Sequence, residues 1–443
     1  MAVILAPLIN VNLSNLIESY IGQLLKIIVL VAEEERLKQN ATRKKKPLVS
    51  HEARQIRCDY SHKKYDLCSI NGPTVLDPTT STFYTANSTS QAPPFHVLKI
   101  RPYPRKWETS IMATIKELTL TSGPPPPSST CQVQHNAPAL VFSAGGYTGN
   151  FFHDFNDGFI PLYITVSSIY PNQDFVLVIS QASDWWVHKY AEVLRAFSKH
   201  HPIVNLDKDT ATHCFTSATI GLMSHGFMTI DSKLIPSSKT LSHFRAFLGK
   251  AYDQGQTHHP DSESRPRLVL ASRTGDVGRV ILNQAELKWV AQDVGFDVVV
   301  FEPRSSDSLR EAYALINSSH VMVGVHGAAL THSLFLRPGS VLVQVVPLGT
   351  QWVAEVCFAN PAKDLGLVYM EYKIGAEESS LVGKYDKNDV VIKDPVAFQG
   401  NYWSTAVMSI YLREQNVKLN LDRFREYLKK AYKEAKKLME NEG

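Results

Sequence analysis

The residues best suited to bind an anion stand in the segment ASRTGDVGR, residues 271–279. This segment follows an apolar run typical of a buried strand and precedes a helical pattern, which predicts a turn at the carboxyl edge of a parallel sheet. Backbone N–H groups and the helix dipole favour anions there, and arginine binds phosphate oxygens bidentately. Arg273 and Arg279 are therefore candidates for holding a diphosphate; the alternative is a solvated basic turn.

A second candidate for anion binding is the segment VMVGVHGAAL, residues 321–330, in which a strand runs into small residues and then a helix. Small residues let a ligand approach the backbone, and the helix N-terminus favours a phosphate. The spacing matches neither the dinucleotide-binding glycine motif nor a Walker loop, so tight packing of helix on sheet is the alternative. Together with the arginine turn, this segment predicts a nucleotide-diphosphate site that includes His326, Gly327, Ala328 and Ala329.

Glu302 follows the apolar run 297–301, which is predicted to be the next strand after the arginine turn. An acid at this edge of a sheet can bind a ribose or a base. The alternative is an exposed carboxylate in a turn.

A candidate for acid–base chemistry lies in the segment GGYTGNFFHDFND, residues 145–157. His153 and Asp157 are four residues apart, so they share one face of a helix, and such a pair can orient an imidazole as a general base. Asp154 is a further acid in the same cluster. The alternative is a satisfied core histidine beside an acid at the start of a helix.

Metal binding is not predicted. The motif Asp207-Lys208-Asp209 looks like the acidic metal motif of some sugar transferases, but we interpret it as an ordinary loop, and no His, Cys or Asp cluster has metal-ligand spacing. The five cysteines form no CxxC pair. Cys58 and Cys68 are candidates for a local disulfide in an oxidising compartment; the alternative is five separate thiols. The four N-x-[ST] sequons, at Asn12, Asn40, Asn87 and Asn317, support a secretory route only slightly.

The elements that must position these residues alternate between strand and helix from Pro138 onwards. Four strands in the second half, alternating with three helices, predict a parallel sheet covered on both faces. Two Rossmann-like halves joined near residue 260 would bind a ligand in the crevice between them. In the first half the predicted strands are 139–143, 175–180 and 203–206, and the helices are 150–169, 184–199 and 240–252. In the second half the strands are 267–271, 297–301, 321–325 and 341–346, and the helices are 283–294, 308–317 and 327–336.

The chain of 443 residues has room for two such domains and terminal extensions, and its net charge of +4 is too small to argue for nucleic acid. Residues 1–50 form an apolar N-terminus and a charged stem, and the apolar run 27–32 is too short to span a bilayer. A degenerate signal-anchor, an amphipathic helix and an incomplete N-terminus stay open. The predicted domains are 51–260, with an irregular segment over 51–95, then 261–400, followed by C-terminal helices over 401–443.

Five collinear motifs resemble glycosyltransferase family 61, in particular its plant branch that decorates xylan. The resemblance implies an α/β protein of the GT-B type, with two facing Rossmann-like domains, an irregular N-terminal stem and C-terminal helices. It implies inverting, metal-independent transfer from a UDP-sugar without a cofactor, and a type II membrane protein in the Golgi lumen. The motifs are CDYSHKKYDLCSING (58–72), IRPYPRK (100–106), FSAGGYTGNFFHDFND (142–157), ASRTGDVGRVILNQAEL (271–287) and GVHGAALTHSLFLRPGSVLVQVVP (324–347).

The resemblance also implies a role for each candidate residue. The arginines and the segment from His326 would hold the UDP-sugar in the C-terminal domain, and His153, Asp154 or Asp157 would take the proton of the acceptor hydroxyl. Gly146, Asn150 and Asn156 would lie on the acceptor side. The predicted reaction moves arabinofuranose or xylose onto xylan. The alternatives are an N-glycan β-1,2-xylosyltransferase and an inactive carbohydrate-binding scaffold subunit; an oxidoreductase is disfavoured because the dinucleotide-binding motif is missing.

Overall fold

The computed structural model describes residues 55–85, 96–252, 265–275, 277–400 and 403–442. The predicted N-terminal segment 1–50, the linker near residue 260 and the sequons at Asn12, Asn40 and Asn87 lie outside these residues. Across the described ranges, no helix combines the length and the apolar character that crossing a bilayer requires. The amide of Asn317, in the fourth sequon, donates to the Phe335 carbonyl, so this side chain is used within the fold.

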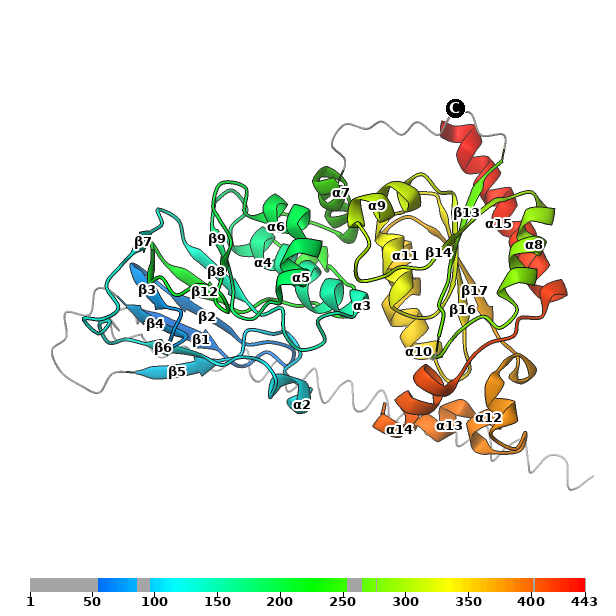
Figure 1. The fold of residues 1–443 in the computed structure, drawn as a ribbon, viewed down its shortest axis with the longest axis horizontal. Coiled ribbons are helices and arrows are strands. Elements are labelled where there is room, and N and C mark those ends of the chain that lie inside the picture. Colours follow the sequence, from blue (N-terminus) through cyan, green and yellow to red (C-terminus); the bar gives the residue numbers. More distant parts are fainter. Residues whose placement is uncertain (1–54, 86–95, 253–264, 276, 401–402, 443) are drawn as a thin grey trace, which may run out of the picture. The chain divides into compact units, whose positions relative to one another are not determined.

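The second half contains a sheet of five parallel strands in the order β14-β13-β15-β16-β17 (Figure 1). Within this sheet, the four strands that come first in the chain are confirmed at their predicted bounds. They could be predicted because continuous apolar runs are typical of buried parallel strands. The fifth was not predicted, since polar residues alternate along it and it is mostly half-buried. The strands are β13 (Arg267–Ala271), β14 (Asp297–Phe301), β15 (Val321–Val325), β16 (Val341–Val346) and β17 (Val368–Lys373).

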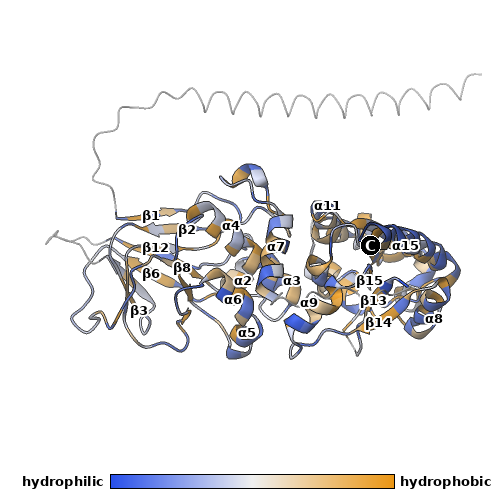
Figure 2. Cartoon of the chain, turned by 90° about the horizontal axis from the view of Figure 1, so that it is seen from above, coloured by the Kyte–Doolittle hydropathy of each residue, from blue (hydrophilic) through white to orange (hydrophobic). Residues whose placement is uncertain are grey.

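Helices cover both faces of this sheet, as predicted. Alternate residues of β13 point to opposite cores: Leu268 and Leu270 pack with α8 (Gln284–Val294) and α15 (Leu421–Glu442), whereas Val269 and Ala271 pack with α9 (Leu309–Asn317) and α11 (Asn360–Asp364). The outer surfaces of α8 and α15 are largely hydrophilic (Figure 2). The last helix, α15, is amphipathic, with Phe424, Leu428, Ala431 and Ala435 buried, and Asn420 caps it by accepting from the Arg423 backbone N–H.

The first half is built on a second sheet, in the order β1-β2-β12-β8-β9-β10, in which the last four strands are mutually parallel. One face packs against helices α4 (Ile160–Ile169) and α6 (Ala191–Phe197). The other face packs against a third sheet, in the order β5-β6-β4-β3-β11-β7. The strands of the second sheet are β1 (Ile56–Asp59), β2 (Leu67–Ile70), β8 (Ala139–Phe142), β9 (Val176–Ile179), β10 (Val204–Asn205) and β12 (Ala218–Ile220).

The segment 51–95 corrects one prediction, because its strands belong to the second and third sheets. Residues 51–95 were expected to be irregular, but four strands lie between residues 56 and 85. Each is only four residues long and rich in Thr, Ser or Asp, so no period-2 pattern is sustained. The strands of this sheet are β3 (Thr74–Asp77), β4 (Thr82–Thr85), β5 (Val97–Ile100), β6 (Leu118–Thr121), β7 (Val133–Gln134) and β11 (His213–Phe215).

Residues on both sides of the predicted boundary share one hydrophobic core. The ring centroid of Phe155 lies 6.3 Å from that of Phe244 in α7 (Leu241–Tyr252) and 6.4 Å from that of Phe335. Residues Gln55–Gly443 form one compact unit. The predicted halves are therefore packed together, which places the carboxyl ends of both parallel sheets near a common region.

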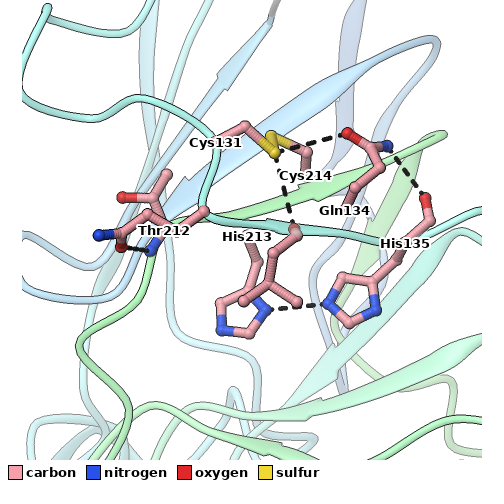
Figure 3. Close-up of a disulfide and its surroundings, with 8 residues drawn as sticks. Cys131, Gln134, His135, Thr212, His213 and Cys214 are labelled. Carbon is pink, nitrogen blue, oxygen red and sulfur yellow. Dashed lines mark hydrogen bonds between the residues drawn. A yellow bond between two sulfur atoms is a disulfide. The ribbon is translucent and has the colours of Figure 1, made fainter.

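Two disulfides tie the first half together. Cys58 and Cys68 face each other across the β1–β2 pair and are joined by a disulfide. Cys131, before β7, is joined to Cys214 in β11 (Figure 3). The second pairing was not predicted, because its cysteines are 83 residues apart in sequence. Cys357 is free and buried.

The long-range disulfide should stabilise the fold more than the local one. In the loop-entropy model, removing Cys131–Cys214 as a double serine variant costs about 4.5 kcal/mol of unfolding free energy, against about 2.7 kcal/mol for Cys58–Cys68. Guanidinium unfolding of both double variants and the native chain measures these differences. A Cys131→Ser, Cys214→Ser variant as stable as the native chain would show that this bridge does not form.

Candidate active site

The anion-binding candidates meet at the point where the strand order of the parallel sheet reverses. β13 and β15 are neighbours there, and ligands of open α/β sheets bind beyond the carboxyl ends of strands at such a point. Arg273 follows β13, and His326 with Gly327 follows β15. The structure therefore brings the two predicted segments together.

Arg279 is held rigidly by backbone carbonyls. Its φ is +57°, and its backbone N–H donates to the Gln415 carbonyl. Its guanidinium donates to the carbonyls of Leu412 and His326, both at 2.9 Å. A strained backbone of this kind persists only where its surroundings fix it. Here the C-terminal segment 405–415, with a π-helix over Ser409–Glu414, orients the guanidinium.

Gly327 explains why a small residue stands in the second segment. Its φ is +156°, and a Cβ atom there would lie 2.5 Å from Nη1 of Arg273 and 3.0 Å from Nη1 of Arg279. Any other residue would displace both guanidiniums. The glycine thus lets the two arginines lie against the backbone at the start of the 3₁₀ helix Ala328–Phe335.

The two arginines are a pair of like charges. Within the described ranges no ion pair involves either of them. Burial, together with the charge of the neighbouring Arg273, lowers the pKa of Arg279 to about 9. Burial and both arginines bring the pKa of His326 to about 3, and its Nδ1 lies 3.0 Å from the Gln344 amide nitrogen. His326 is therefore neutral, and the two arginine cations beside it have no carboxylate partner among the described residues. This arrangement favours the binding of an anion.

A cavity of about 400 Å³ opens beside the arginines, and this volume is typical of ligand pockets. Both halves line it: Gly149, Asn150, Phe151 and Lys189 from the first, and Arg273, Glu302, Ala328, Ala329 and His332 among those from the second. The Phe151 ring stacks on His332 with centroids 4.0 Å apart. Glu302 accepts from the Thr274 hydroxyl. Asn150 was predicted on the acceptor side, yet it lines the same cavity as Arg273. We call this the arginine cavity.

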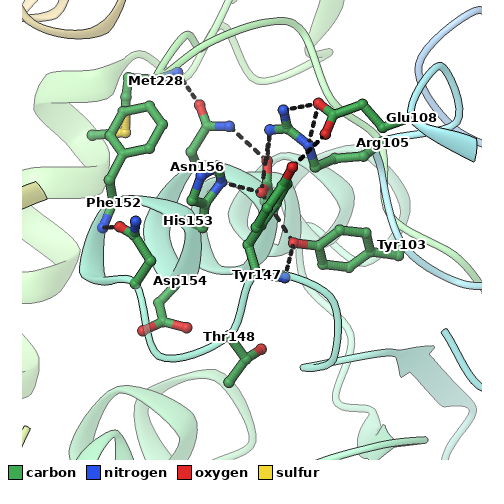
Figure 4. A network of polar contacts seen from close by, with 12 residues as sticks. Tyr103, Arg105, Glu108, Tyr147, Thr148, Phe152, His153, Asp154, Asn156 and Met228 are labelled. Carbon is green, nitrogen blue, oxygen red and sulfur yellow. Dashed lines mark hydrogen bonds and ion pairs between the residues drawn. The ribbon is translucent and has the colours of Figure 1, made fainter. Parts of the chain in front are cut away.

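Asp157 contacts four polar side chains in a buried network, and Figure 4 shows these partners: Tyr103, Arg105, His153 and Asn156. The Tyr103 hydroxyl and Nη1 of Arg105 each donate to it at 3.0 Å, the Asn156 amide donates at 2.6 Å, and Nδ1 of His153 lies 2.7 Å away. Burial alone would raise its pKa, but the His153 hydrogen bond and the Arg105 charge outweigh burial and hold the pKa below its usual range. Asp157 is therefore an ionised group that orients His153.

Asp154 is directed elsewhere. Its carboxylate accepts from the Trp186 indole N–H at 3.0 Å and from the Tyr190 hydroxyl at 2.8 Å, and burial raises its pKa. The side chain of Asp157 is only 2% exposed, whereas that of His153 is 17% exposed. Of the three predicted bases, His153 alone combines access with an orienting carboxylate.

The remaining predicted residues support this network. The Asn156 carbonyl accepts from the Met228 backbone N–H at 2.7 Å, so both ends of its amide are occupied. Gly146 has a φ of +63°, and a Cβ there would lie 2.8 Å from the Tyr103 ring. The two side chains that fix Asp157 from outside the helix, Tyr103 and Arg105, lie in the IRPYPRK motif. We assigned them no role, because nothing in the sequence indicates that this loop folds against residue 157.

A second cavity, of about 360 Å³, lies at the other end of the segment 149–157, which contains His153 and which we call the His153 segment. It is lined by Asn156 and Asp157 and, from elsewhere in the chain, by Lys63, Lys64, Pro104, Trp107, Ser224, Gly226, Phe227 and Trp352. Residues 149–151 line the arginine cavity, so the segment 149–157 reaches from one cavity to the other with His153 between them. Residues 154–159 form a π-helix, a feature common at functional sites. We call the second cavity the aromatic cavity.

Metal ligation has no visible candidate in the described part of the chain, where no three His, Cys, Asp or Glu side chains are grouped to hold an ion. The Asp207 carboxylate accepts from the Ala182 backbone N–H at 3.0 Å, and Asp209 lies 3.0 Å from His213. These contacts agree with the interpretation of residues 207–209 as an ordinary loop.

Comparison with known proteins identifies the family. The family model for glycosyltransferase 61 matches residues 149–343, which include the His153 segment and both anion-binding segments. A xylan glycosyltransferase of Arabidopsis thaliana is 42% identical over 87% of this chain and 81% of its own length. Two proteins of Oryza sativa subsp. japonica are also similar. An α-1,3-arabinosyltransferase is 36% identical over 84% of this chain and 64% of its own length. A β-1,2-xylosyltransferase is 35% identical over 85% of this chain and 83% of its own length. The chain therefore belongs to glycosyltransferase family 61 and is a glycosyltransferase.

Proposed function

We propose that this enzyme transfers a pentose, arabinofuranose or xylose, from a UDP-sugar onto the xylan backbone. The observation that carries the proposal is the segment 149–157, which reaches from a cavity lined by Arg273, with Arg279 beside that arginine, to an aromatic cavity, with His153 between the two. The activities for which the similar plant proteins are named, on xylan or with arabinose and xylose, support the choice of sugars. The two halves would act as the facing domains of a GT-B enzyme.

In the proposed mechanism the UDP-sugar binds in the arginine cavity. Arg273 and Arg279 would hold the diphosphate, and the first backbone N–H groups of the 3₁₀ helix, at Ala328 and Ala329, would donate to it. As the bond between the anomeric carbon and the diphosphate breaks, negative charge grows on UDP, and the fixed guanidiniums stabilise that charge. Glu302 would contact the ribose or the base.

The acceptor hydroxyl would approach from the aromatic cavity. His153 takes its proton as the oxygen attacks the anomeric carbon from the face opposite to UDP, and Asp157 stabilises the imidazolium that forms. One displacement inverts the configuration of the anomeric carbon. The arginines supply the positive charge that a divalent cation would otherwise provide, so we propose that the transfer needs no metal.

We further propose that the enzyme works in the Golgi lumen, with a type II anchor as the family resemblance implies. The two disulfides support this compartment, because disulfides form and persist in the oxidising secretory route.

A donor screen on the full chain tests the proposed function. Xylohexaose is the acceptor, UDP-arabinofuranose, UDP-xylose and UDP-N-acetylglucosamine are offered in turn, EDTA is present or absent, and products are measured by mass. We expect one pentose to be added, at the same rate in EDTA. Transfer to an N-glycan but not to xylohexaose would overturn the proposed acceptor. Loss of activity in EDTA would overturn the proposed metal-free mechanism. An absence of UDP binding would indicate an inactive scaffold.

A further inference from the structure

Three aromatic rings line one wall of the aromatic cavity: Trp107, Phe227 and Trp352. They come from three distant parts of the chain: the loop before α2 (Thr109–Met112), the loop after β12, and α10 (Gln351–Ala354). The centroid of Phe227 lies 6.4 Å from that of Trp107 and 6.0 Å from that of Trp352. Both contacts are edge-to-face, with interplanar angles of 77° and 89°, so Phe227 stands between the two tryptophans. The fold therefore assembles a cluster of three aromatic rings, which we call the aromatic platform.

The platform is exposed but rigidly held. Trp107 is 46% exposed and Trp352 is 49% exposed, although large aromatic side chains gain most of their stabilising free energy from burial. The Arg105 guanidinium, which donates to Asp157, lies 5.0 Å from the Trp107 ring centroid, and the Trp403 ring lies 6.4 Å from that of Trp352. A fixed, solvent-facing aromatic surface beside the proposed base indicates a ligand that covers it.

The chemistry of the surface indicates which ligand this is. The faces of an aromatic ring carry partial negative charge, and they attract C–H groups that carry partial positive charge. A β-1,4-linked xylopyranose has equatorial hydroxyls, so its two faces present only C–H bonds, and its hydroxyls point outward from the ring edge. The Ser224 hydroxyl, which also lines the cavity, can bind such a hydroxyl.

A nucleotide is a poorer match for this cavity. Two lysines line the cavity, Lys63 and Lys64. Of these, Lys64 already donates to the His225 carbonyl at 2.6 Å, and burial lowers its pKa. Arg273, for which the described residues show no carboxylate partner, lines the other cavity, and Arg279 lies beside Arg273. A neutral sugar chain therefore fits the aromatic cavity better than a diphosphate does.

We propose that Trp107, Phe227 and Trp352 bind the acceptor polysaccharide, the two tryptophans stacking on its pyranose rings with Phe227 between them, so that one hydroxyl is presented to His153. This inference rests on the proposed function and names the acceptor site for it. The rings would contribute to binding the acceptor and not to the chemical step.

Alanine variants of the exposed tryptophans test the platform. We expect Trp352→Ala and Trp107→Ala each to raise KM for xylohexaose about tenfold or more, as stacked rings do when truncated, with kcat changed far less and UDP affinity unchanged. Trp352→Phe should restore most of the affinity. The matched control is Trp289→Ala, because Trp289 is 65% exposed on α8 and should leave both constants unchanged. Circular dichroism and melting temperature verify that each variant folds.

Calorimetric binding of xylohexaose to the full chain separates the two proposals. If no donor supports transfer but xylohexaose binds the native chain and binds Trp352→Ala at least tenfold more weakly, the platform stands and the proposed function fails. If transfer occurs and both alanine variants keep the native KM, the function stands and the platform is overturned. Binding of a peptide to these aromatic rings, with no binding of any xylo-oligosaccharide, would also overturn the proposed platform.

Discussion

Replacing His153 by glutamine is expected to lower kcat for pentose transfer by about a thousandfold, within the range measured for general bases. The imidazole is held by a carboxylate whose other contacts, from Tyr103, Arg105 and Asn156, leave it no freedom to turn away. Glutamine keeps much of the volume and a polar end but cannot take a proton. KM for the UDP-sugar and the melting temperature should stay near their native values, since His153 does not line the arginine cavity.

The chain offers a matched control for this variant. Nδ1 of His200 also lies beside a carboxylate, 2.9 Å from Asp174, but both side chains are mostly exposed and distant from the cavities. His200→Gln should transfer pentose at the native rate. A His153→Gln variant that retains a third or more of the native kcat, with an unchanged pH profile, would exclude His153 as the base.

Replacing Arg279 by alanine is expected to weaken UDP binding about 10- to 150-fold, because a hydrogen bond to a charged group contributes about 1.5–3 kcal/mol. The turnover number should fall as well, by about a hundredfold, since the guanidinium also stabilises the charge that develops on the leaving group. Arg279→Lys should recover only part of both losses, because an ammonium lacks the planar fork of donors. Calorimetric titration with UDP and steady-state transfer rates measure the two effects.

Arg337→Ala is the control for a lost arginine. Arg337 also donates to a backbone carbonyl, that of Asn317 at 2.6 Å, but its charge is paired with Glu442 and it is not beside Arg273. Its loss should leave UDP affinity unchanged. Native UDP affinity and turnover in Arg279→Ala would contradict the assignment of the diphosphate site.

The parallel sheet and the arginine turn could be predicted because their information is local. Val321 to Val325 and Val341 to Val346 are continuous apolar runs, and each is followed by glycine or proline. Once strands are parallel, their carboxyl ends share an edge, so the proximity of Arg273 and Gly327 follows from topology. The pair His153 and Asp157 follows from helical spacing alone.

The rest depends on contacts between residues that are distant in sequence. Nothing near Cys131 indicates that its partner is Cys214, and nothing near Arg105 indicates that it binds Asp157. The four-residue strands of the third sheet are too short for their alternation to be recognised, and their pairing fixes them. The aromatic platform could not be predicted either, since Trp107, Phe227 and Trp352 are scattered in the sequence and come together only when the halves pack.

A crystal structure of the enzyme with UDP and xylohexaose tests the central claim most directly. We predict that the UDP diphosphate contacts the guanidiniums of Arg273 and Arg279, that pyranose rings stack on Trp107 and Trp352, and that one acceptor hydroxyl lies about 3 Å from Nε2 of His153. UDP bound outside the arginine cavity, or an acceptor hydroxyl placed nearest to a residue other than His153, would contradict the account.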